Sequence, residues 1–209
     1  YLWYCNKCNY LWISFCKDEW YNLMANLYLA LRELWQVEFS NDPDKFLHKN
    51  SGEHGLTLGG VYQVANPSQI NWTFINGLLL LCGNDMKRAG RMLYFDTETM
   101  EKVKGVFHNS YWSKLQLDKV ESQKIANEIF LFAVVSGVKN GAKVAQKLIG
   151  VESDGVIGNV TLNALNAYDE NKFDIEFDKL EIAFFENLVD NKPALSKFLR
   201  GWKNRAVLV

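Results

Sequence analysis

The sequence lacks the features that mark nucleic-acid-binding and membrane-spanning proteins. Its 209 residues include 23 Lys and Arg against 24 Asp and Glu, and the formal net charge is −1. Because neither sign dominates, electrostatics gives no reason to expect nucleic acid as a main partner. Apolar stretches are short and interrupted, so we expect no stable insertion into a membrane. With 48% hydrophobic and 22% charged residues, the chain is typical of a globular protein.

Metal-ligand and targeting patterns are also sparse. The chain has 4 cysteines and 3 histidines. Cys5 and Cys8 have the spacing of half a zinc site and Cys16 follows, but no second pair at matching spacing completes it. The histidines are too scattered for a metal site. We therefore expect no metal and no cofactor, with a zinc module at the N-terminus as a weaker alternative. Residues 1–17 have no basic segment before a clean apolar run, so no signal peptide is readable there.

Helical periodicity dominates what the chain does contain. With 3 prolines, long helices are permitted. Apolar residues recur at steps of three and four, which predicts amphipathic helices. The expected helices run from Asp18, as N-cap, to about Val37, over 97–112, from Asp118, as N-cap, to about Gly137, over 141–149, from Thr161 to Leu165, and over 175–190 and 194–207. Residues 39–62 are rich in glycine and leave room for at most a small β-hairpin. We therefore predict a mainly α fold.

Glu38 is the residue that the sequence singles out as a candidate catalytic acid. It ends the first apolar helix and precedes a glycine-rich loop. Apolar surroundings favour the protonated form of a carboxyl group, which is the form that a general acid needs. The alternative is a glutamate exposed at a helix end, where the helix dipole disfavours an anion.

The loop after Glu38 holds further polar side chains. Glu53 and His54 lie between glycines, and Thr57 comes shortly before another pair of glycines. Glycosidase chemistry needs an acid on one side of the sugar bond and a base or a water-holding group on the other. Glu38, Glu53 and Thr57 could supply these groups. The glycines would let the backbone turn sharply beside a bulky polymer.

The order of these residues resembles the glycoside hydrolase family 108 muramidases, which are lysozyme-like enzymes of phage endolysins and bacterial secretion loci. Their motif reads roughly Glu-Gly-Gly-Tyr-x-Asn-Asp-Pro, then Gly-Gly-x-Thr-x-x-Gly-Ile. The matching positions are Glu38 for the catalytic Glu, Asn41-Asp42-Pro43, Thr57 and Gly60-Val61. Phe39 and Ser40 stand where the family has two glycines, and Glu53 is the acid nearest to the family's loop Asp.

A second resemblance lies in the C-terminal half. Residues 154–162, Asp-Gly-Val-Ile-Gly-Asn-Val-Thr-Leu, resemble the Asp-Gly-x-x-Gly-x-x-Thr-Leu signature of peptidoglycan-binding helical modules. Residues 146–148 match the helix before that signature. Residues 201–205, Gly-Trp-Lys-Asn-Arg, resemble the ending of the same module in family 108 proteins. Together, the resemblances imply an N-terminal extension of unknown role at 1–17, a lysozyme-like catalytic part at 18–117 and a helical peptidoglycan-binding part at 118–209.

The signature also has a purely structural interpretation. Asp154 and Gly155 would form a turn between helices, with Gly158 at positive φ. Asn159 or Thr161 would cap the next helix. Adjacent Val156 and Ile157 would fill the core, so that most of the motif would serve folding and only Asp154 would be a candidate sugar contact.

Other candidate substrate contacts are aromatic or lie in the loop. Pyranose rings stack on aromatic faces, although packing in the core is the usual role of such rings. The candidates for substrate binding are Tyr62, His54, Trp72, Trp112 and Asp154.

The resemblance implies a peptidoglycan hydrolase that cleaves the bond between N-acetylmuramic acid and N-acetylglucosamine. Glu38 would protonate the leaving oxygen, and Glu53 would activate a water that Thr57 helps to hold. Two alternatives stay open: a lytic transglycosylase that uses Glu38 alone, and a non-catalytic peptidoglycan-binding protein. The expected partner is the peptidoglycan glycan strand. We expect a monomer that acts on the cell wall, in the periplasm or after release from the cytoplasm by a holin or another export route.

Overall fold

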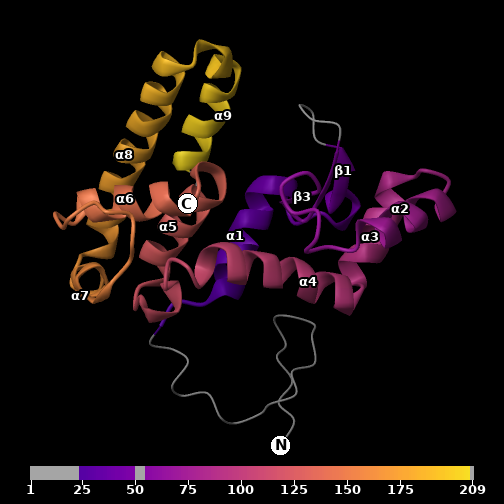
Figure 1. Cartoon of the computed structure of the whole chain (residues 1–209), viewed down its shortest axis with the longest axis horizontal. Coiled ribbons are helices and arrows are strands. Elements are labelled where there is room, and N and C mark those ends of the chain that lie inside the picture. The colour runs from indigo at the N-terminus through magenta and orange to yellow at the C-terminus, as the bar shows by residue number, and fades with distance from the viewer. Residues whose placement is uncertain (1–23, 50–54, 208–209) are drawn as a thin grey trace, which may run out of the picture.

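The computed structural model of the chain describes residues 24–49 and 55–207. Helices dominate these residues, which confirms the mainly α fold (Figure 1). The α-helices are α1 (Leu27–Phe39), α2 (Trp72–Leu81), α3 (Met86–Phe95), α4 (Thr97–Phe107), α5 (Gln123–Ser136), α6 (Val138–Leu148), α7 (Asn159–Asn166), α8 (Glu170–Asn191) and α9 (Ser196–Ala206). Short helical turns are η1 (Pro43–Lys45), η2 (His108–Trp112), η3 (Leu117–Lys119) and η4 (Pro193–Leu195). Within this part of the chain, none of the helices combines the length and the apolar character that crossing a membrane requires.

A small antiparallel sheet follows the first helix. Its strands, β1 (Leu47–Lys49), β2 (Leu56–Leu58) and β3 (Val61–Tyr62), are arranged in the order β1-β2-β3. The sheet lies in the region where the sequence allowed a hairpin and exceeds that hairpin by one short strand. In its register Thr57 lies opposite His48 on one side and Tyr62 on the other.

The first helix begins later than its periodicity predicts. Residues 24–26 are not helical, and Asn26 is the N-cap of α1. Its Oδ1 accepts a hydrogen bond from the backbone N–H of Tyr28 at 2.8 Å, and its own backbone N–H donates to Gln123 Oε1 at 2.6 Å. These bonds fix the helix start against α5. The N-cap predicted at Asp18 lies outside the described residues.

The next predicted cap is also displaced. Asp118 lies in η3, and Ser122 caps α5 instead, because its Oγ accepts from the backbone N–H of Ile125 at 3.3 Å. The predicted helix over 97–112 is present as α4 continued by η2. The predicted helices beyond Gly137 correspond to α6, α7, α8 and α9, with ends displaced by a few residues.

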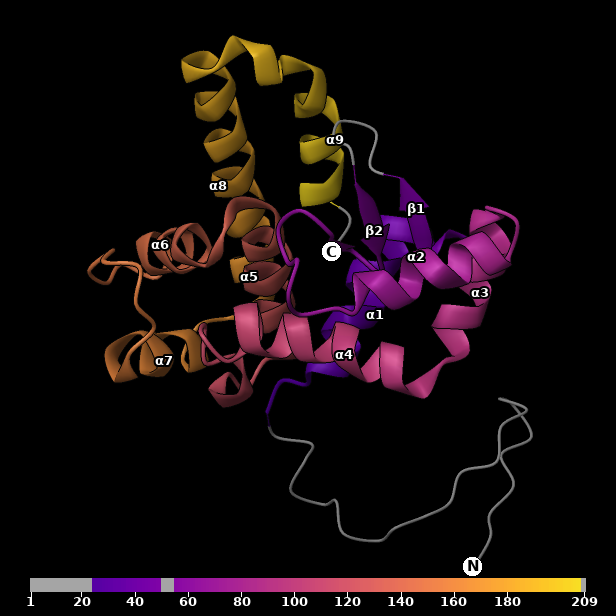
Figure 2. The same ribbon diagram turned by 45° about the vertical axis from the view of Figure 1, so that its right-hand side comes forward.

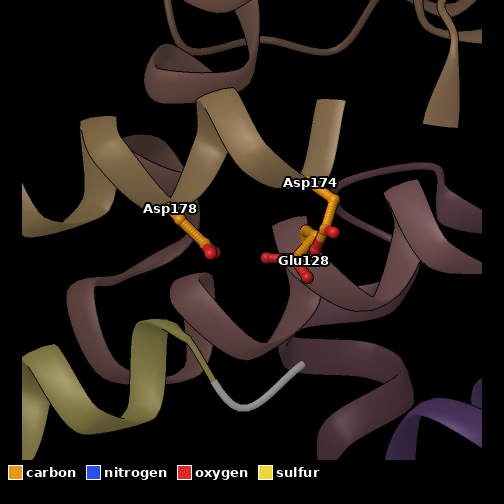
Figure 3. Close-up of side chains that lie close together, drawn as sticks. All are labelled: Glu128, Asp174 and Asp178. Atoms are coloured by element: carbon orange, nitrogen blue, oxygen red, sulfur yellow. The ribbon is translucent and has the colours of Figure 1, made fainter. Parts of the chain in front are cut away.

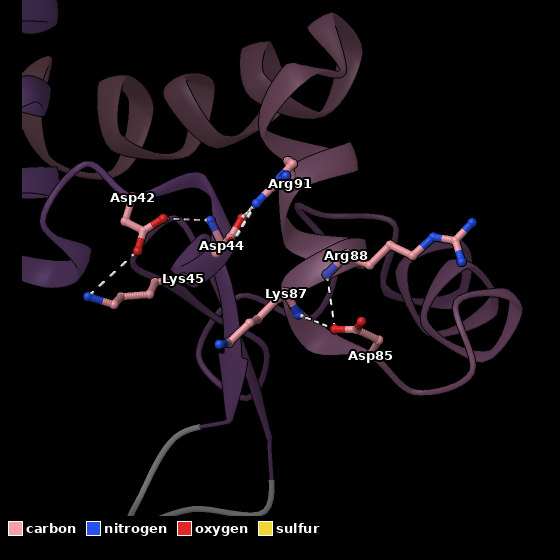
Figure 4. Close-up of polar contacts among 7 residues, drawn as sticks. All are labelled: Asp42, Asp44, Lys45, Asp85, Lys87, Arg88 and Arg91. Atoms are coloured by element: carbon pink, nitrogen blue, oxygen red, sulfur yellow. Dashed lines mark hydrogen bonds and ion pairs between the residues drawn. The ribbon is translucent and has the colours of Figure 1, made fainter.

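The Asn-Asp-Pro segment turns the chain from α1 into the sheet. Asp42 accepts from the backbone N–H of Asp44 at 3.0 Å and so caps η1. Asp44 in turn receives two hydrogen bonds from Arg91 on α3, at 2.7 and 2.8 Å (Figure 4). Asp85 caps the same helix, α3, through its bonds from two backbone N–H groups. A Cβ on Gly90 would lie only 3.0 Å from the backbone nitrogen of Leu47, so glycine allows α3 to pack directly on β1.

Buried apolar side chains form one cluster that includes residues from both sides of the predicted boundary at 117 and 118. Helix α5 lies between the two sides and packs on α1, α6 and α8 (Figures 1 and 2). Polar contacts add to this packing, since Asn127 on α5 donates to Glu33 on α1 at 2.5 Å. Helices α8 and α9 form an antiparallel pair that projects from the rest, and the end of α9 returns toward α1 (Figure 2).

Candidate functional site

Glu38 lies in the last turn of α1, beside the sheet. Its side chain is 19% exposed. A Cβ on Gly60 would lie 3.8 Å from Glu38 Cγ, so the turn between β2 and β3 passes directly over the carboxyl-bearing side chain. The structure therefore places the candidate acid in a partly apolar setting at the edge of the small sheet.

The turn beside Glu38 depends on two glycines. Gly59 and Gly60 have φ values of +54° and +87°, in the left-handed region that other residues rarely adopt. Gly59 also has no room for a side chain, because a Cβ there would lie 2.5 Å from a ring carbon of Phe46. The indole N–H of Trp35, one turn before Glu38, donates to Gly59 O at 3.1 Å. These contacts hold the turn in place against α1.

Ser40, which stands where family 108 has a glycine, keeps a glycine-like conformation. It ends α1 with φ +58°, and Asn41 follows at +51°. Phe39 is 3% exposed and packs edge-to-face on Phe46. Ser40 and Asn41 thus turn the chain sharply after Glu38, and the Phe39 ring fills the core beside it.

Arg205 is the closest charged partner of Glu38. Its Nη1 donates to Glu38 Oε1 at 2.6 Å, and the Arg205 side chain is only 13% exposed. Its other terminal nitrogen, Nη2, is buried without a hydrogen-bond partner among the described residues. Arg205 comes from the last turn of α9, so the end of the C-terminal segment reaches the candidate acid. Sequence reasoning included Arg205 in a motif but gave it no role.

Thr57 and Tyr62 are directly opposed on β2 and β3, so their side chains share one face of the sheet. Thr57 is 1% exposed, and its hydroxyl oxygen has no hydrogen-bond partner among the described residues. The Tyr62 side chain is 37% exposed. Glu53 and His54 lie outside the described residues, so their predicted roles stay predictions.

Both tryptophans proposed as sugar contacts lie in the core. Trp72 is 6% exposed, and its indole N–H donates to Asn66 O at 3.1 Å. Trp112 is 2% exposed and packs on Phe130 with ring centroids 5.6 Å apart. Neither ring has an exposed face on which a pyranose could stack, and their contacts are those of packing residues.

Gln146 organises the turn that carries the second motif. It is 1% exposed. Its Nε2 donates to Asp154 Oδ1 and Val156 O at 2.8 and 2.9 Å, and its Oε1 accepts from the Gly155 N–H at 2.8 Å. The same Nε2 lies 3.3 Å from the hydroxyl of Thr161. Backbone N–H of Val156 also donates to Asp154 Oδ1 at 2.8 Å. Asp154 therefore stabilises the turn through both hydrogen bonds. Its side chain is also exposed, so it stays accessible to a ligand.

Three details of this turn differ from the sequence-based expectation. Gly158 has φ −110°, whereas Gly155 is the residue with positive φ, at +85°. The N-cap of α7 is Gly158, with no side-chain cap. Ile157 is buried as predicted, but Val156 is 67% exposed, because its backbone N–H and C=O are bonded to Asp154 and Gln146 and its side chain is left in solvent.

A surface pocket of about 390 Å³ lies between α6, α8 and the turn. Its polar lining combines lysine, amide and hydroxyl side chains: Asn140, Lys143, Lys147, Ser153 and Asn187. Neither lysine forms an ion pair within the described residues. Phe184 supplies an apolar wall. Free ammonium groups beside amides suit a ligand that carries carboxylates and acetamido groups.

A buried acidic cluster is a further feature that sequence reasoning missed. It comprises Glu128 on α5 with Asp174, Asp178 and Glu181 on α8. Burial, reinforced by the neighbouring carboxylates, raises the pKa of Glu128 to about 9. Burial also raises the pKa of Asp178 to about 6 and that of Glu181 to about 7, the latter against the opposing charge of Arg205. A glutamate within the apolar run from Ile125 to Ala133 is the signal that could have revealed the cluster.

Comparisons with known proteins support the resemblance of the C-terminal helices to a peptidoglycan-binding module. Residues 140–207, which comprise most of α6 and all of α7, α8 and α9, match a family model described as a predicted peptidoglycan domain. The chain is similar to the solved structure of Brucella abortus SagA, with a TM-score of 0.58 and 21% sequence identity over 86% of this chain and 88% of that chain. At this identity the likeness shows a shared fold. No curated protein matches the chain.

Proposed function

We propose that this protein is a peptidoglycan hydrolase of the family 108 type that cleaves the bond between N-acetylmuramic acid and N-acetylglucosamine. The observation that carries the proposal is the position of Glu38, four-fifths buried at a helix end beside the Gly59–Gly60 turn. A carboxyl group in such a setting can protonate a glycosidic oxygen. The peptidoglycan-domain match at 140–207 supports peptidoglycan as the substrate.

The second half of the reaction requires a water on the opposite side of the sugar ring. The buried Thr57 hydroxyl, which has no protein partner among the described residues, is available to hold that water. Glu53 is the proposed base. Carboxyl groups about 6.5–9.5 Å apart would favour inversion, and about 5–5.5 Å would favour retention. Tyr62 lies next to Thr57 across the sheet and is the aromatic side chain best placed to contact a sugar there.

Arg205 adds a condition to this mechanism. A general acid donates a proton, and the Glu38 carboxylate is held by a guanidinium at 2.6 Å. Productive binding therefore requires substrate to enter beside Glu38 and displace Arg205. Because Arg205 belongs to α9, we propose that the segments 18–117 and 118–209 act as one unit, with the second binding the glycan and also contacting the acid.

Digestion of purified peptidoglycan tests the proposal. Wild type should release products with reducing muramic acid ends, identified by mass spectrometry. Glu38→Gln should lower this release by at least about 100-fold, the usual effect of losing a general acid. Glu121→Gln, at an exposed position before α5, is the matched control and should digest normally. Undiminished digestion by Glu38→Gln would overturn the role of Glu38.

Two alternatives give different products in the same experiment. Anhydromuramic ends from wild type would indicate a lytic transglycosylase in which Glu38 acts alone. Absence of soluble product from wild type, with binding to sacculi intact, would indicate a peptidoglycan-binding protein. The ion pair between Glu38 and Arg205 is the observation that favours this last alternative, because it occupies the carboxylate.

The pocket between α6 and α8 is the proposed glycan or stem-peptide contact. Replacing Lys143 and Lys147 together by Ala should lower the amount of protein that sediments with sacculi. The variant loses the two ammonium groups that would bind the carboxylates of the peptidoglycan. The double variant Lys87→Ala/Lys192→Ala removes the same charge from two exposed positions outside this pocket and should sediment as wild type does. Equal loss in both double variants would show that net charge, and not the pocket, governs binding.

A further inference from the structure

Three carboxylates from two helices converge between α5 and α8. Glu128 comes from α5, and Asp174 and Asp178 come from one face of α8, four residues apart (Figure 3). One oxygen from each side chain lies within 4.8 Å of the other two. This places three carboxyl groups around one small volume.

Two of the oxygens have no partner that would justify their burial. Glu128 is 2% exposed, and its Oε1 accepts no hydrogen bond among the described residues. Asp178 Oδ1 is also buried and also accepts no hydrogen bond among the described residues. In Figure 3 the carboxyl group of Glu128 points toward Asp178. Buried polar atoms are nearly always paired, so two such oxygens require either a bound cation or a proton between them.

The surrounding cations do not supply that charge. Lys124 contacts Asp174 Oδ2 at 2.9 Å from the more exposed side of the cluster. Arg205 lies close enough to Glu181 to influence its ionisation, but its hydrogen bond goes to Glu38. These two cations are therefore outnumbered by the acidic side chains that they contact or influence: Glu38, Glu128, Glu170, Asp174, Asp178 and Glu181.

We propose that Glu128, Asp174 and Asp178 bind a divalent hard cation, with Ca²⁺ as the best fit. The set contains only oxygen ligands, which suit Ca²⁺, Mg²⁺ or Mn²⁺ and disfavour zinc and copper. Ca²⁺–oxygen distances of about 2.3–2.6 Å allow ligand oxygens up to about 5 Å apart, whereas the shorter Mg²⁺ distances of about 2.0–2.1 Å allow about 4 Å. The three ligand oxygens are no more than 4.8 Å apart, which lies within the range that Ca²⁺ allows throughout.

The partial exposure of the two aspartates completes the site. The Asp174 side chain is 19% exposed, and Asp178 is intermediate in burial, so waters can enter on that side and fill the remaining coordination positions. The ion would join α5, in the centre of the molecule, to α8, which carries α9. This site departs from the sequence-based expectation of no metal, and it goes beyond the proposed hydrolase chemistry.

Calorimetric titration of the chelator-treated full chain with CaCl₂ tests the site. Wild type should bind one Ca²⁺, and its Tm should rise by roughly 5–10 °C at a Ca²⁺ concentration of about 100 times the Kd. MgCl₂ should give a smaller rise at the same concentration. The result that overturns the proposal is a wild type that shows neither binding heat nor a Tm shift with Ca²⁺, Mg²⁺ or Mn²⁺, in which case protons balance the cluster.

Variants separate this site from weaker surface binding. Glu128→Gln keeps the shape of the side chain and should abolish the Ca²⁺-dependent shift, and Asp178→Asn, which is less buried, should do the same if the first variant fails to fold. Glu152→Gln removes one exposed carboxylate outside the three-carboxylate set and should keep the full shift. A shift that survives in both Glu128→Gln and Asp178→Asn would place the ion elsewhere and overturn the assignment.

Discussion

The guanidinium of Arg205 contacts the carboxylate of Glu38 at 2.6 Å, although 167 residues separate them in the sequence. The pair connects the end of α9 to the end of α1. The segment that matches the peptidoglycan domain therefore also contributes the closest charge to the candidate acid. Any movement of α9 changes the surroundings of Glu38.

This ion pair should contribute measurably to folding. The two side chains are 13% and 19% exposed, so both are largely removed from water. A double-mutant cycle with Glu38→Gln and Arg205→Gln should give a coupling energy of about 1–3 kcal/mol, measured from urea unfolding. The exposed pair Lys203–Glu186, 38% and 48% exposed, is the matched control and should couple by less than about 1 kcal/mol. Equal coupling energies in the two cycles would contradict the prediction that burial strengthens the Glu38–Arg205 pair.

Thr57 offers a test that separates stability from function. Its hydroxyl is buried without a partner, so Thr57→Val should leave the free energy of unfolding unchanged or raise it by about 1 kcal/mol. Turnover of peptidoglycan should fall, because the proposed water loses a hydrogen-bond partner. Thr161→Val is the contrast: that hydroxyl is bonded to Gln146, and its loss should destabilise by about 1 kcal/mol. Loss of stability in Thr57→Val as large as in Thr161→Val would indicate an unseen structural partner.

Gly59 should tolerate no side chain. Alanine there would have φ near +54° and a Cβ 2.5 Å from the ring of Phe46. Gly59→Ala should therefore destabilise by about 2–4 kcal/mol and displace the turn beside Glu38. Gly105→Ala on α4, where a Cβ meets nothing within 4 Å, should stabilise by about 0.5–1 kcal/mol. Urea midpoints of the two variants should thus move in opposite directions, and equal shifts would contradict the steric argument.

Local patterns made most of the helices predictable, because apolar spacing and turn residues act within a few positions. The sheet was anticipated only as a hairpin, since its third strand is two residues long and depends on pairing with β2. The start of α1 was misjudged because Asn26 is fixed by Gln123, which is distant in sequence. Contacts of this kind leave no local signal.

The site was predictable in the same uneven way. Glu38 and the glycines after it could be found from their order along the chain. The pairing of Glu38 with Arg205 could not be found in this way, because it depends on how α9 returns along α8. Glu128 did leave a signal, a charge within an apolar run, but its partners on α8 become visible only when the helices pack. Membership of family 108 and the roles of Glu53 and His54 stay predictions.

Asp154 should make the stability of the peptidoglycan-domain segment sensitive to acid. The backbone N–H of Val156, followed by the Gln146 side chain, holds the pKa of Asp154 below its ordinary value. A carboxylate with a lower pKa in the folded state adds stability above the unfolded-state pKa of about 3.9, and that stability is lost as the pH falls through the folded-state value. A variant that lacks only the charge tests this effect.

Asp154→Asn keeps the accepting oxygen but has no charge. The free-energy advantage of wild type over this variant, measured from urea midpoints, should therefore be largest near pH 7 and shrink below about pH 4. Asp190→Asn, whose exposed carboxylate accepts no hydrogen bond within the described chain, should show no such pH-dependent difference. An advantage over Asp154→Asn that stays constant with pH would mean that the charge of Asp154 does not stabilise the turn.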